Sequence, residues 1–147
     1  MRVRKASPAS PMARTLAWLR EHGYEAAVAE KWIPHTPIRQ DLFGFIDVMA
    51  VNDQHLLAIQ VTDHTHHAEH RGKILKNKAA RLLVYHMDIE LWSWGLQLTG
   101  EKRKDGKLNR AKQQTLKRES FTAKLLPKKS LLRRKMESGE WPMHTLD

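Results

Sequence analysis

The chain has 147 residues, a net charge of +10 at pH 7 and no cysteine. This length suits one domain with a real hydrophobic core and excludes two independent domains. The absence of cysteine excludes disulfides, thiolate zinc sites and cysteine nucleophiles, so a bound metal would need oxygen or imidazole ligands, which favours hard cations.

Apolar runs in the sequence are short, and none approaches the roughly 20 residues that span a bilayer. The opening residues, MRVRKASPAS, also lack the apolar segment of a secretory signal. We therefore expect a cytoplasmic protein that is not associated with a membrane.

Positive charge is concentrated toward the C-terminus. Residues 101–147 hold 14 Lys/Arg against 6 Asp/Glu, whereas residues 1–100 hold 12 against 10. A basic segment of this density attracts a polyanion by counterion release, and nucleic acid is the leading candidate. The alternative is a solvated tail that only aids solubility.

The N-terminal part predicts a short disordered segment followed by a helix. Residues 1–10 are basic and contain proline, which is typical of a disordered lead-in. Ser10 can cap a helix, Pro11 fits its first turn, and Gly23 ends it. The folded domain is therefore expected over residues 11–99.

Three strands are expected next. Residues 24–33 predict a first strand that Pro34 ends. Two apolar runs, Leu42–Val51 and His55–Thr62, flank the turn Asn52-Asp53-Gln54 and predict an antiparallel hairpin. The hairpin is the strongest local prediction of the sequence.

A helix and two strands complete the predicted domain. The His-rich residues 63–67 are expected as a loop, followed by a short amphipathic helix over Ala68–Ala79. Arg81–His86 and Ile89–Trp94 are apolar runs that predict two more strands. Trp18 and Trp32 are expected in the core, and Trp92 and Trp94 as core or surface cover rather than as a base-stacking platform.

Residues 100–147 are expected to be a basic C-terminal extension, partly helical or disordered. Apolar residues are scattered there, and residues 108–119 offer only the thin apolar face of Leu108 and Leu116. A helix in this region would form on binding a partner.

The candidate site lies on the predicted hairpin. Asp47 stands between Ile46 and Val48 in an otherwise apolar strand. A buried carboxylate is costly unless it is paired, hydrogen-bonded or bound to a metal. Strand alternation also allows Asp47 to face solvent, but Phe45 and Met49 would share its face, which favours an interior position.

Three further oxygen donors complete the candidate metal site. Gln60 and Thr62 share one face of the next strand, opposite Asp47, and offer an amide oxygen and a hydroxyl. Glu30 lies near the end of the preceding strand, although it is equally an exposed residue beside Lys31. Asp47, Gln60 and Glu30 are thus the predicted ligands of Mg²⁺ or Mn²⁺.

Basic residues follow the hairpin. Lys73 and Arg71 lie on the predicted second helix, where they are positioned to neutralise phosphate or polarise water. A solvated helix face, shared with Lys76 and Lys78, is an equal alternative.

The His-rich segment contains an imidazole pair at helical spacing, His66 and His70. No second pair accompanies it, so a dedicated zinc site is the weaker interpretation and contact with phosphate or substrate the stronger.

The predicted α-β-β-β-α-β order, with Asp47 in the second strand and Gln60-Val61-Thr62 in the third, resembles the PD-(D/E)XK nuclease superfamily of Holliday junction resolvases and restriction endonucleases. A phage-associated group within this superfamily is more narrowly similar. The similar runs are Lys31-Trp32, residues 38–47 and residues 58–62. The resemblance covers residues 11–95 and implies an α/β restriction-endonuclease-like core: a central mixed sheet flanked by helices.

The resemblance also implies roles for individual residues. Asp47 would be the motif aspartate, Gln60 would stand where the family has an acidic residue, and Thr62 would stand in place of the usual lysine. Glu30, with Lys73 or Arg71, would restore the missing charges. Resolvases of this fold act as two-fold dimers, which implies a homodimer, and a phage-encoded protein would work in the cytoplasm of a bacterial host.

We therefore expect a Mg²⁺- or Mn²⁺-dependent DNA endonuclease that acts on duplex or branched DNA, similar to a Holliday junction resolvase. The alternative is a non-catalytic DNA-binding or architectural module that retains the fold; an RNA-binding protein is a third, weaker interpretation. The residues expected to contact nucleic acid are basic: Arg39, Arg71, Lys76, Lys102, Arg103, Lys104, Arg110, Lys117, Arg118, Lys128, Lys129, Arg133 and Arg134.

Overall fold

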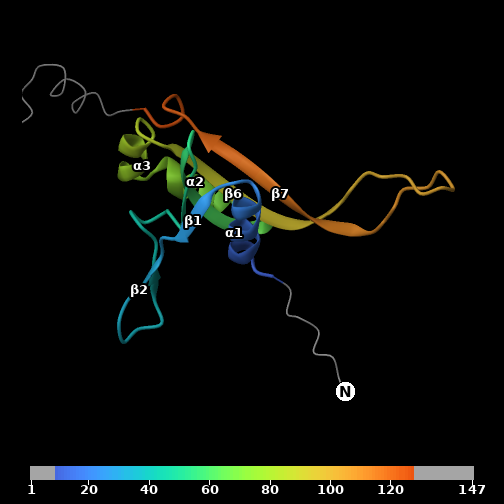
Figure 1. Ribbon diagram of the computed structural model, residues 1–147, viewed down its shortest axis with the longest axis horizontal. Coiled ribbons are helices and arrows are strands. Elements are labelled where there is room, and N and C mark those ends of the chain that lie inside the picture. The colour runs from blue at the N-terminus through green and yellow to red at the C-terminus, as the bar shows by residue number, and fades with distance from the viewer. Residues whose placement is uncertain (1–8, 128–147) are drawn as a thin grey trace, which may run out of the picture.

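A five-stranded mixed sheet organises the computed structural model, which describes residues 9–127 (Figure 1). The elements in chain order are α1 (Pro11–Glu21), β1 (Glu25–Val28), β2 (Lys31–Trp32), β3 (Arg39–Gln40), β4 (Val48–Val51), β5 (Leu56–Asp63), the 3₁₀ helix η1 (His64–His66), α2 (His67–Leu75), α3 (Lys78–Leu83), β6 (Asp88–Leu98) and β7 (Lys112–Phe121). The strand order in the sheet is β1-β4-β5-β6-β7. Strands β5 and β6 are parallel, and the other neighbours are antiparallel.

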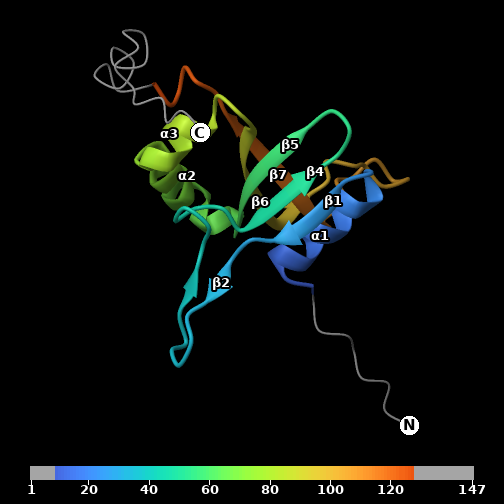
Figure 2. The same ribbon diagram turned by 60° about the vertical axis from the view of Figure 1, so that its left-hand side comes forward.

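Helices cover both faces of this sheet (Figure 2). Leu19 of α1 packs with Leu57 and Ile59 of β5 on one face. Ile74 of α2 packs on the other face with Ala58, the residue between them on β5. The alternation of β5 thus divides its side chains between two apolar layers. A mixed α/β architecture with a central mixed sheet is confirmed.

The first helix begins and ends where the sequence predicts. Ser10 is its N-cap and accepts a hydrogen bond from the Ala13 N–H at 3.1 Å. Pro11 occupies the first turn. Gly23 follows the helix with a φ of +84°, a conformation that glycine adopts without strain.

The prediction of one strand over residues 24–33 is wrong. Only Glu25–Val28 joins the main sheet as β1, and Lys31–Trp32 pairs with Arg39–Gln40 in a separate two-stranded hairpin. Figures 1 and 2 show this β2–β3 hairpin projecting from the body of the molecule. Trp32 is 56% exposed, so its expected place in the core is also wrong.

The main hairpin is antiparallel as predicted, but its first strand is shorter. β4 begins at Val48, which pairs with Ile59 of β5. Residues 42–46 form a turn, closed by the hydrogen bond from Leu42 N–H to the Ile46 carbonyl at 3.1 Å. Phe43 in this turn has a φ of +53°. The apolar run therefore includes a turn whose last residues are buried in the core rather than one long strand.

The segment after β5 contains two helices instead of one. α2 ends at Leu75, and Asn77 caps α3 by accepting a hydrogen bond from the Ala80 N–H at 2.9 Å. The expected strand at Arg81–His86 is wrong, because its first half belongs to α3 and packing of Ala80 in the core stabilises that helix. The strand at Ile89–Trp94 is confirmed and extends over all of β6.

The sheet continues past residue 99, where the sequence predicts the domain to end. Residues 112–121 form β7, antiparallel to β6, so the helix expected over 108–119 is wrong. Leu116 and Phe121 pack against opposite apolar layers of the sheet. The free edge of β6 supplies the backbone hydrogen-bond partners of β7. The spacing of apolar side chains in residues 112–121 does not reveal that such an edge is available.

Outside the described residues lie the predicted disordered lead-in up to residue 8 and the basic Lys128, Lys129, Arg133 and Arg134. Within residues 9–127, no helix combines the length and the apolar composition that a membrane crossing requires.

Close packing of His64 on Gly95 predicts a large response to one methyl group. A Cβ at Gly95 would lie 2.2 Å from the His64 ring. That ring bonds Ser93 Oγ at 3.0 Å and Thr115 Oγ1 at 3.2 Å, and so joins η1 to β6 and β7. Gly95→Ala should therefore lower the free energy of unfolding by about 1–3 kcal/mol in urea denaturation.

Gly72 provides the matched control. A Cβ at this position in α2 would meet no atom within 4 Å. Gly72→Ala should raise the free energy of unfolding by about 0.5–1 kcal/mol, because alanine is the better helix former. Equal stabilities of the two variants would show that His64 moves aside freely.

Candidate metal site

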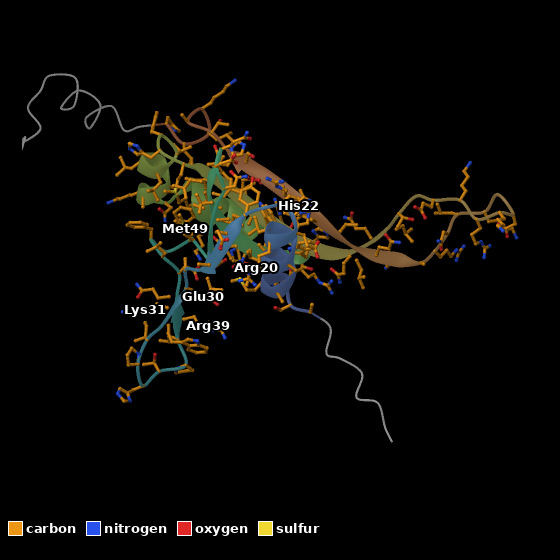
Figure 3. The ribbon with its side chains drawn as sticks, viewed as in Figure 1. Arg20, His22, Glu30, Lys31, Arg39 and Met49 are labelled. Atoms are coloured by element: carbon orange, nitrogen blue, oxygen red, sulfur yellow. The ribbon has the colours of Figure 1, made fainter. Side chains whose placement is uncertain are left out.

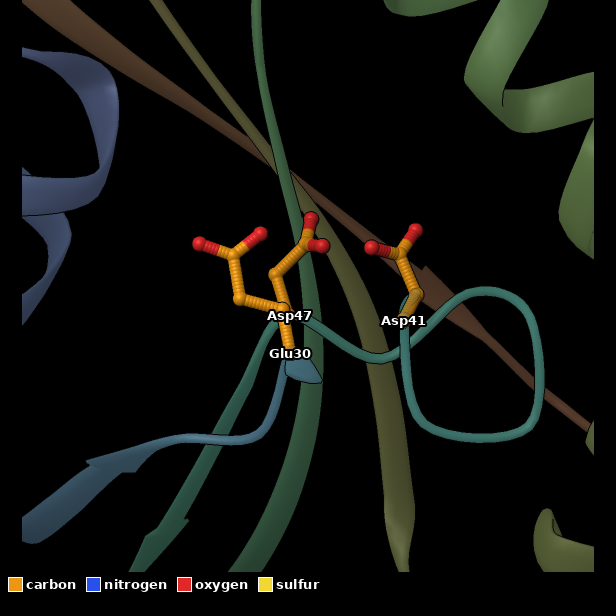
Figure 4. A group of neighbouring side chains, drawn as sticks. All are labelled: Glu30, Asp41 and Asp47. Carbon is orange, nitrogen blue, oxygen red and sulfur yellow. The ribbon is translucent and has the colours of Figure 1, made fainter. Parts of the chain in front are cut away.

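Three carboxylates converge at one end of the main hairpin. Glu30, Asp41 and Asp47 each place an oxygen within 4.8 Å of the others (Figure 4). Glu30 follows β1, Asp41 follows β3 and Asp47 directly precedes β4. Glu30 and Asp47 are predicted site residues, whereas Asp41 is not.

Asp47 is held rigidly between β1 and β5. Its N–H donates to the Ile59 carbonyl at 2.9 Å, and its carbonyl accepts from the Ala29 N–H at 2.8 Å. The residue is 7% exposed, and its Oδ2 accepts from the Val61 N–H at 2.8 Å. This buried carboxylate is therefore hydrogen-bonded, as the apolar run around it indicates.

Burial raises the pKa of Asp47 to about 7 from its ordinary 3.8. The hydrogen bond from Val61 opposes this shift, and the neighbouring Asp41 carboxylate adds to it. Asp47 is consequently part-protonated at neutral pH in the metal-free protein, and a cation that binds there would displace the proton.

Gln60 brings an amide into the cluster from β5. It is 1% exposed, and its Nε2 donates to Asp47 Oδ2 at 3.3 Å and to Asp41 Oδ2 at 3.5 Å. Its Oε1 is buried without a hydrogen-bond partner in the described structure. An unpaired buried carbonyl oxygen costs about 1–3 kcal/mol. A half-turn of the amide would direct Oε1 at the two aspartates, an arrangement that a cation between them would stabilise.

A lysine reaches the same group of side chains. Lys73 of α2 donates from Nζ to Asp41 Oδ2 at 3.1 Å, so this predicted residue belongs to the site. Thr62 is buried two residues beyond Gln60 on the same face of β5. Within the described chain, the Thr62 hydroxyl makes no hydrogen bond to the three carboxylates.

Glu30 is neutralised from the projecting hairpin. Arg39 Nη1 lies 3.0 Å from Glu30 Oε1. The same guanidinium stacks on the Trp32 ring, 4.3 Å from its centroid. Figure 3 shows Glu30, Lys31 and Arg39 along this hairpin. Arg39 therefore belongs to the surroundings of the three carboxylates.

Arg71 has a structural partner away from the site. Its Nε donates to Glu119 Oε2 of β7 at 2.8 Å, and His67 contacts Glu119 Oε1 at 3.1 Å. Partial burial opposes ionisation, yet the bonds from Arg71 and His67 lower the pKa of Glu119. The expectation that Arg71 reaches the hairpin end is wrong, because this ion pair holds it at β7.

Arg118 is likewise part of the fold. It donates to both carboxylate oxygens of Glu90, at 2.9 and 3.1 Å, and its guanidinium lies over the rings of Trp18 and Trp92. These contacts make Arg118 a structural residue of the sheet, and its expected contact with nucleic acid stays a prediction.

The other predicted nucleic-acid contacts within the described residues lie on the surface. Lys76 follows α2, and Lys117 is exposed on β7. The connection between β6 and β7 carries four more predicted contact residues: Lys102, Arg103, Lys104 and Arg110. This connection extends far from the helices in Figure 1. Exposed basic residues are therefore present apart from the carboxylates.

The His-rich segment makes hydrogen bonds within the fold. His66 Nδ1 contacts Asp63 at 2.8 Å, and His64 and His67 contact Ser93 Oγ at 3.0 and 2.8 Å. In the part of the chain that the structure describes, the one converging group of acidic or imidazole ligands is Glu30, Asp41 and Asp47.

Asp41 is the site residue that sequence reasoning missed. A signal was present, because Gly44 in the run Asp41-Leu42-Phe43-Gly44 is typical of a turn. A turn there returns the chain and brings Asp41 back beside Asp47.

Comparisons with protein-family models, curated proteins and solved structures gave no significant match to this chain.

Proposed function

We propose that this chain is a metal-dependent DNA endonuclease with a restriction-endonuclease-like core, acting on duplex or branched DNA. The observation that carries the proposal is a compact donor set: three carboxylates, a buried amide with an unpaired oxygen, and a lysine at the edge. Hard oxygen donors of this kind suit Mg²⁺ or Mn²⁺.

Gln60 gives the proposal its second support. Its Nε2 faces Asp47 and Asp41 while its Oε1 has no partner, and a cation between the aspartates would be bound by Oε1 after a half-turn of the amide. Asp41, Asp47 and Gln60 would hold the cation, with Glu30 completing the set. A bound divalent cation would activate water and offset charge on the phosphate.

The remaining residues provide positioning and charge. Lys73, bonded to Asp41 and exposed to solvent, would donate to a phosphate oxygen and stabilise the charge that develops there. The Val61 N–H holds the Asp47 carboxylate in place, and this would fix the position of the donor set relative to β5. The basic β6–β7 connection would contact the phosphate backbone.

The quaternary state is part of the proposal. A two-fold homodimer would present two such sites to the strands of a branched DNA substrate. Light scattering of the purified chain tests this directly.

A non-catalytic DNA-binding module is the second candidate. It is favoured by the basic β6–β7 connection, which extends away from the helices and from the β2–β3 hairpin (Figure 1), and by Gln60 and Thr62 where the resembled superfamily has an acid and a lysine. It predicts salt-sensitive DNA binding that is indifferent to divalent metal.

The test is cleavage of duplex and four-way-junction DNA with Mg²⁺ or Mn²⁺, and with EDTA as the blank. Lys73→Met should lower the single-turnover rate about 10²-fold at saturating DNA, because a transition-state charge partner is lost. Lys76→Met removes the same charge just after α2 and should leave the rate nearly unchanged.

Metal-independent binding without cleavage in either cation would reject the endonuclease and support the binding module. Cleavage that Lys73→Met leaves unchanged would retain the endonuclease and reject the role of Lys73.

A further inference from the structure

The β2–β3 hairpin connects two of the three carboxylates. Glu30 directly precedes β2, and Asp41 directly follows β3 (Figures 3 and 4). Its two strands pair with each other and not with the five-stranded sheet. A shift of this hairpin would therefore act on both Glu30 and Asp41, whereas Asp47 is anchored to the sheet.

Arg39 connects the hairpin to the metal site. Its guanidinium is 3.0 Å from Glu30 Oε1, and its side chain is 54% exposed while that of Glu30 is 18% exposed. The arginine thus neutralises a potential ligand from the solvent side. A cation entering the site would meet both a competitor for Glu30 and a like charge.

The outer surface of the hairpin has the chemistry of a nucleic-acid contact. Trp32 and Ile38 are more than half exposed. Trp32 and Arg39 are cross-strand partners. A guanidinium on an aromatic ring at a projecting hairpin suits a phosphate with its adjoining sugar or base.

We propose that Arg39 couples DNA binding to metal binding. In the free protein it pairs with Glu30; when DNA contacts the β2–β3 hairpin, a phosphate takes the guanidinium and Glu30 becomes available to the cation. Metal and DNA then bind cooperatively, so the complete metal site forms on the substrate. The inference rests on the proposed function, because it needs a cation among these carboxylates.

Thermodynamic linkage makes the coupling measurable from either ligand. If DNA raises the affinity for the cation by some factor, the cation raises the affinity for DNA by the same factor. Removing Arg39 should remove the competitor for Glu30, so the cation should bind tightly even without DNA. The coupling should disappear while cation binding remains.

The experiment is calorimetric titration of the full chain with Ca²⁺, a hard oxygen-seeking cation, with and without a short DNA duplex. In the wild type, duplex should tighten Ca²⁺ binding about 5-fold or more, at the lower end of typical couplings. Without DNA, Arg39→Gln should bind Ca²⁺ about 5-fold more tightly than wild type, and duplex should then add less than about 2-fold.

Two variants serve as controls. Lys31→Gln removes one positive charge from the same hairpin without touching the Glu30 pair and should keep the wild-type coupling. Arg39→Lys keeps the positive charge and should retain part of the coupling between DNA and Ca²⁺ binding. Circular dichroism checks that each variant is folded.

The outcomes separate the two proposals. Wild-type coupling in Arg39→Gln overturns the Arg39 inference and leaves the metal site standing. Equal loss of coupling in Lys31→Gln also overturns it, since general charge would explain the effect. Absence of Ca²⁺ binding in the wild type, with and without DNA, overturns the metal site itself.

Discussion

Asp47→Asn is expected to abolish metal-dependent cleavage and, at the same time, to stabilise the metal-free protein at pH 8. The substitution removes the most buried carboxylate of the site but keeps an acceptor oxygen for the Val61 N–H. Without that charge a bound cation would lose its anchored ligand, so the proposed endonuclease activity should be absent with Mg²⁺ or Mn²⁺.

The stability change follows from the raised pKa. Asp47 has a pKa of about 7 in the folded protein against an ordinary 3.8, so the folded state holds its proton to higher pH than the unfolded state does. Its contribution to stability is complete below pH 3.8 and is lost as pH rises through about 7. Asparagine does not ionise, so the variant keeps this stability at high pH. At about 1.4 kcal/mol per pKa unit, the wild type loses at most about 4 kcal/mol of its free energy of unfolding.

Urea denaturation at pH 5 and pH 8, with chelator, measures the effect. The advantage of Asp47→Asn over wild type should be greater at pH 8 than at pH 5. Asp53→Asn, in the exposed turn of the main hairpin, makes the same change of charge and should show no such pH dependence. An Asp47→Asn protein that cleaves DNA, or that is less stable than wild type at pH 8, would contradict the assigned environment of Asp47.

Arg118→Gln is expected to lower the free energy of unfolding by about 3–5 kcal/mol, because it leaves a buried carboxylate without its cation. The Glu90 side chain is 6% exposed and accepts two hydrogen bonds from Arg118 and one from Trp92 Nε1 at 3.2 Å. Stacking of Arg118 on Trp18 and Trp92 is lost as well. Thermal and urea denaturation at pH 7 give the measurement.

Lys117→Gln is the matched control, since Lys117 is the neighbouring residue on β7 and is exposed. It should change stability by less than about 0.5 kcal/mol, while reducing the salt dependence of the proposed DNA binding by about one counterion. The double variant Glu90→Gln/Arg118→Gln removes both charges and should be more stable than Arg118→Gln alone. If Arg118→Gln were as stable as Lys117→Gln, the Glu90 pair would contribute little to the fold.

Local signals in the sequence were sufficient for several elements. Ser10, Pro11 and Gly23 define α1 through capping and turn chemistry that involves only neighbouring residues. The turn at Asn52 pairs β4 with β5 in antiparallel register, and that register places Gln60 beside Asp47. Half of the candidate metal site could thus be predicted, because a hairpin brings together residues close in sequence.

Other elements depended on partners that local patterns do not specify. Residues 81–83 are expected in a strand, yet the burial of Ala80 in the core places them in α3. The sparse apolar pattern of residues 112–121 is that of a weakly amphipathic helix. The segment is instead a strand, β7, because its backbone pairs with the free edge of β6. In each case a tertiary contact outweighs a small intrinsic preference.

The sequence by itself determined that Asp47 lies in an apolar hairpin beside Gln60, that hard oxygen ligands are available and that basic charge is abundant. Only the tertiary structure decided that Asp41 and Lys73 join the site, that Arg39 pairs with Glu30 and that Arg118 is held by Glu90. The reason is physical. Capping and strand alternation act over a few residues, whereas ion pairs and carboxylate clusters join groups that the chain brings together only after the sheet has formed.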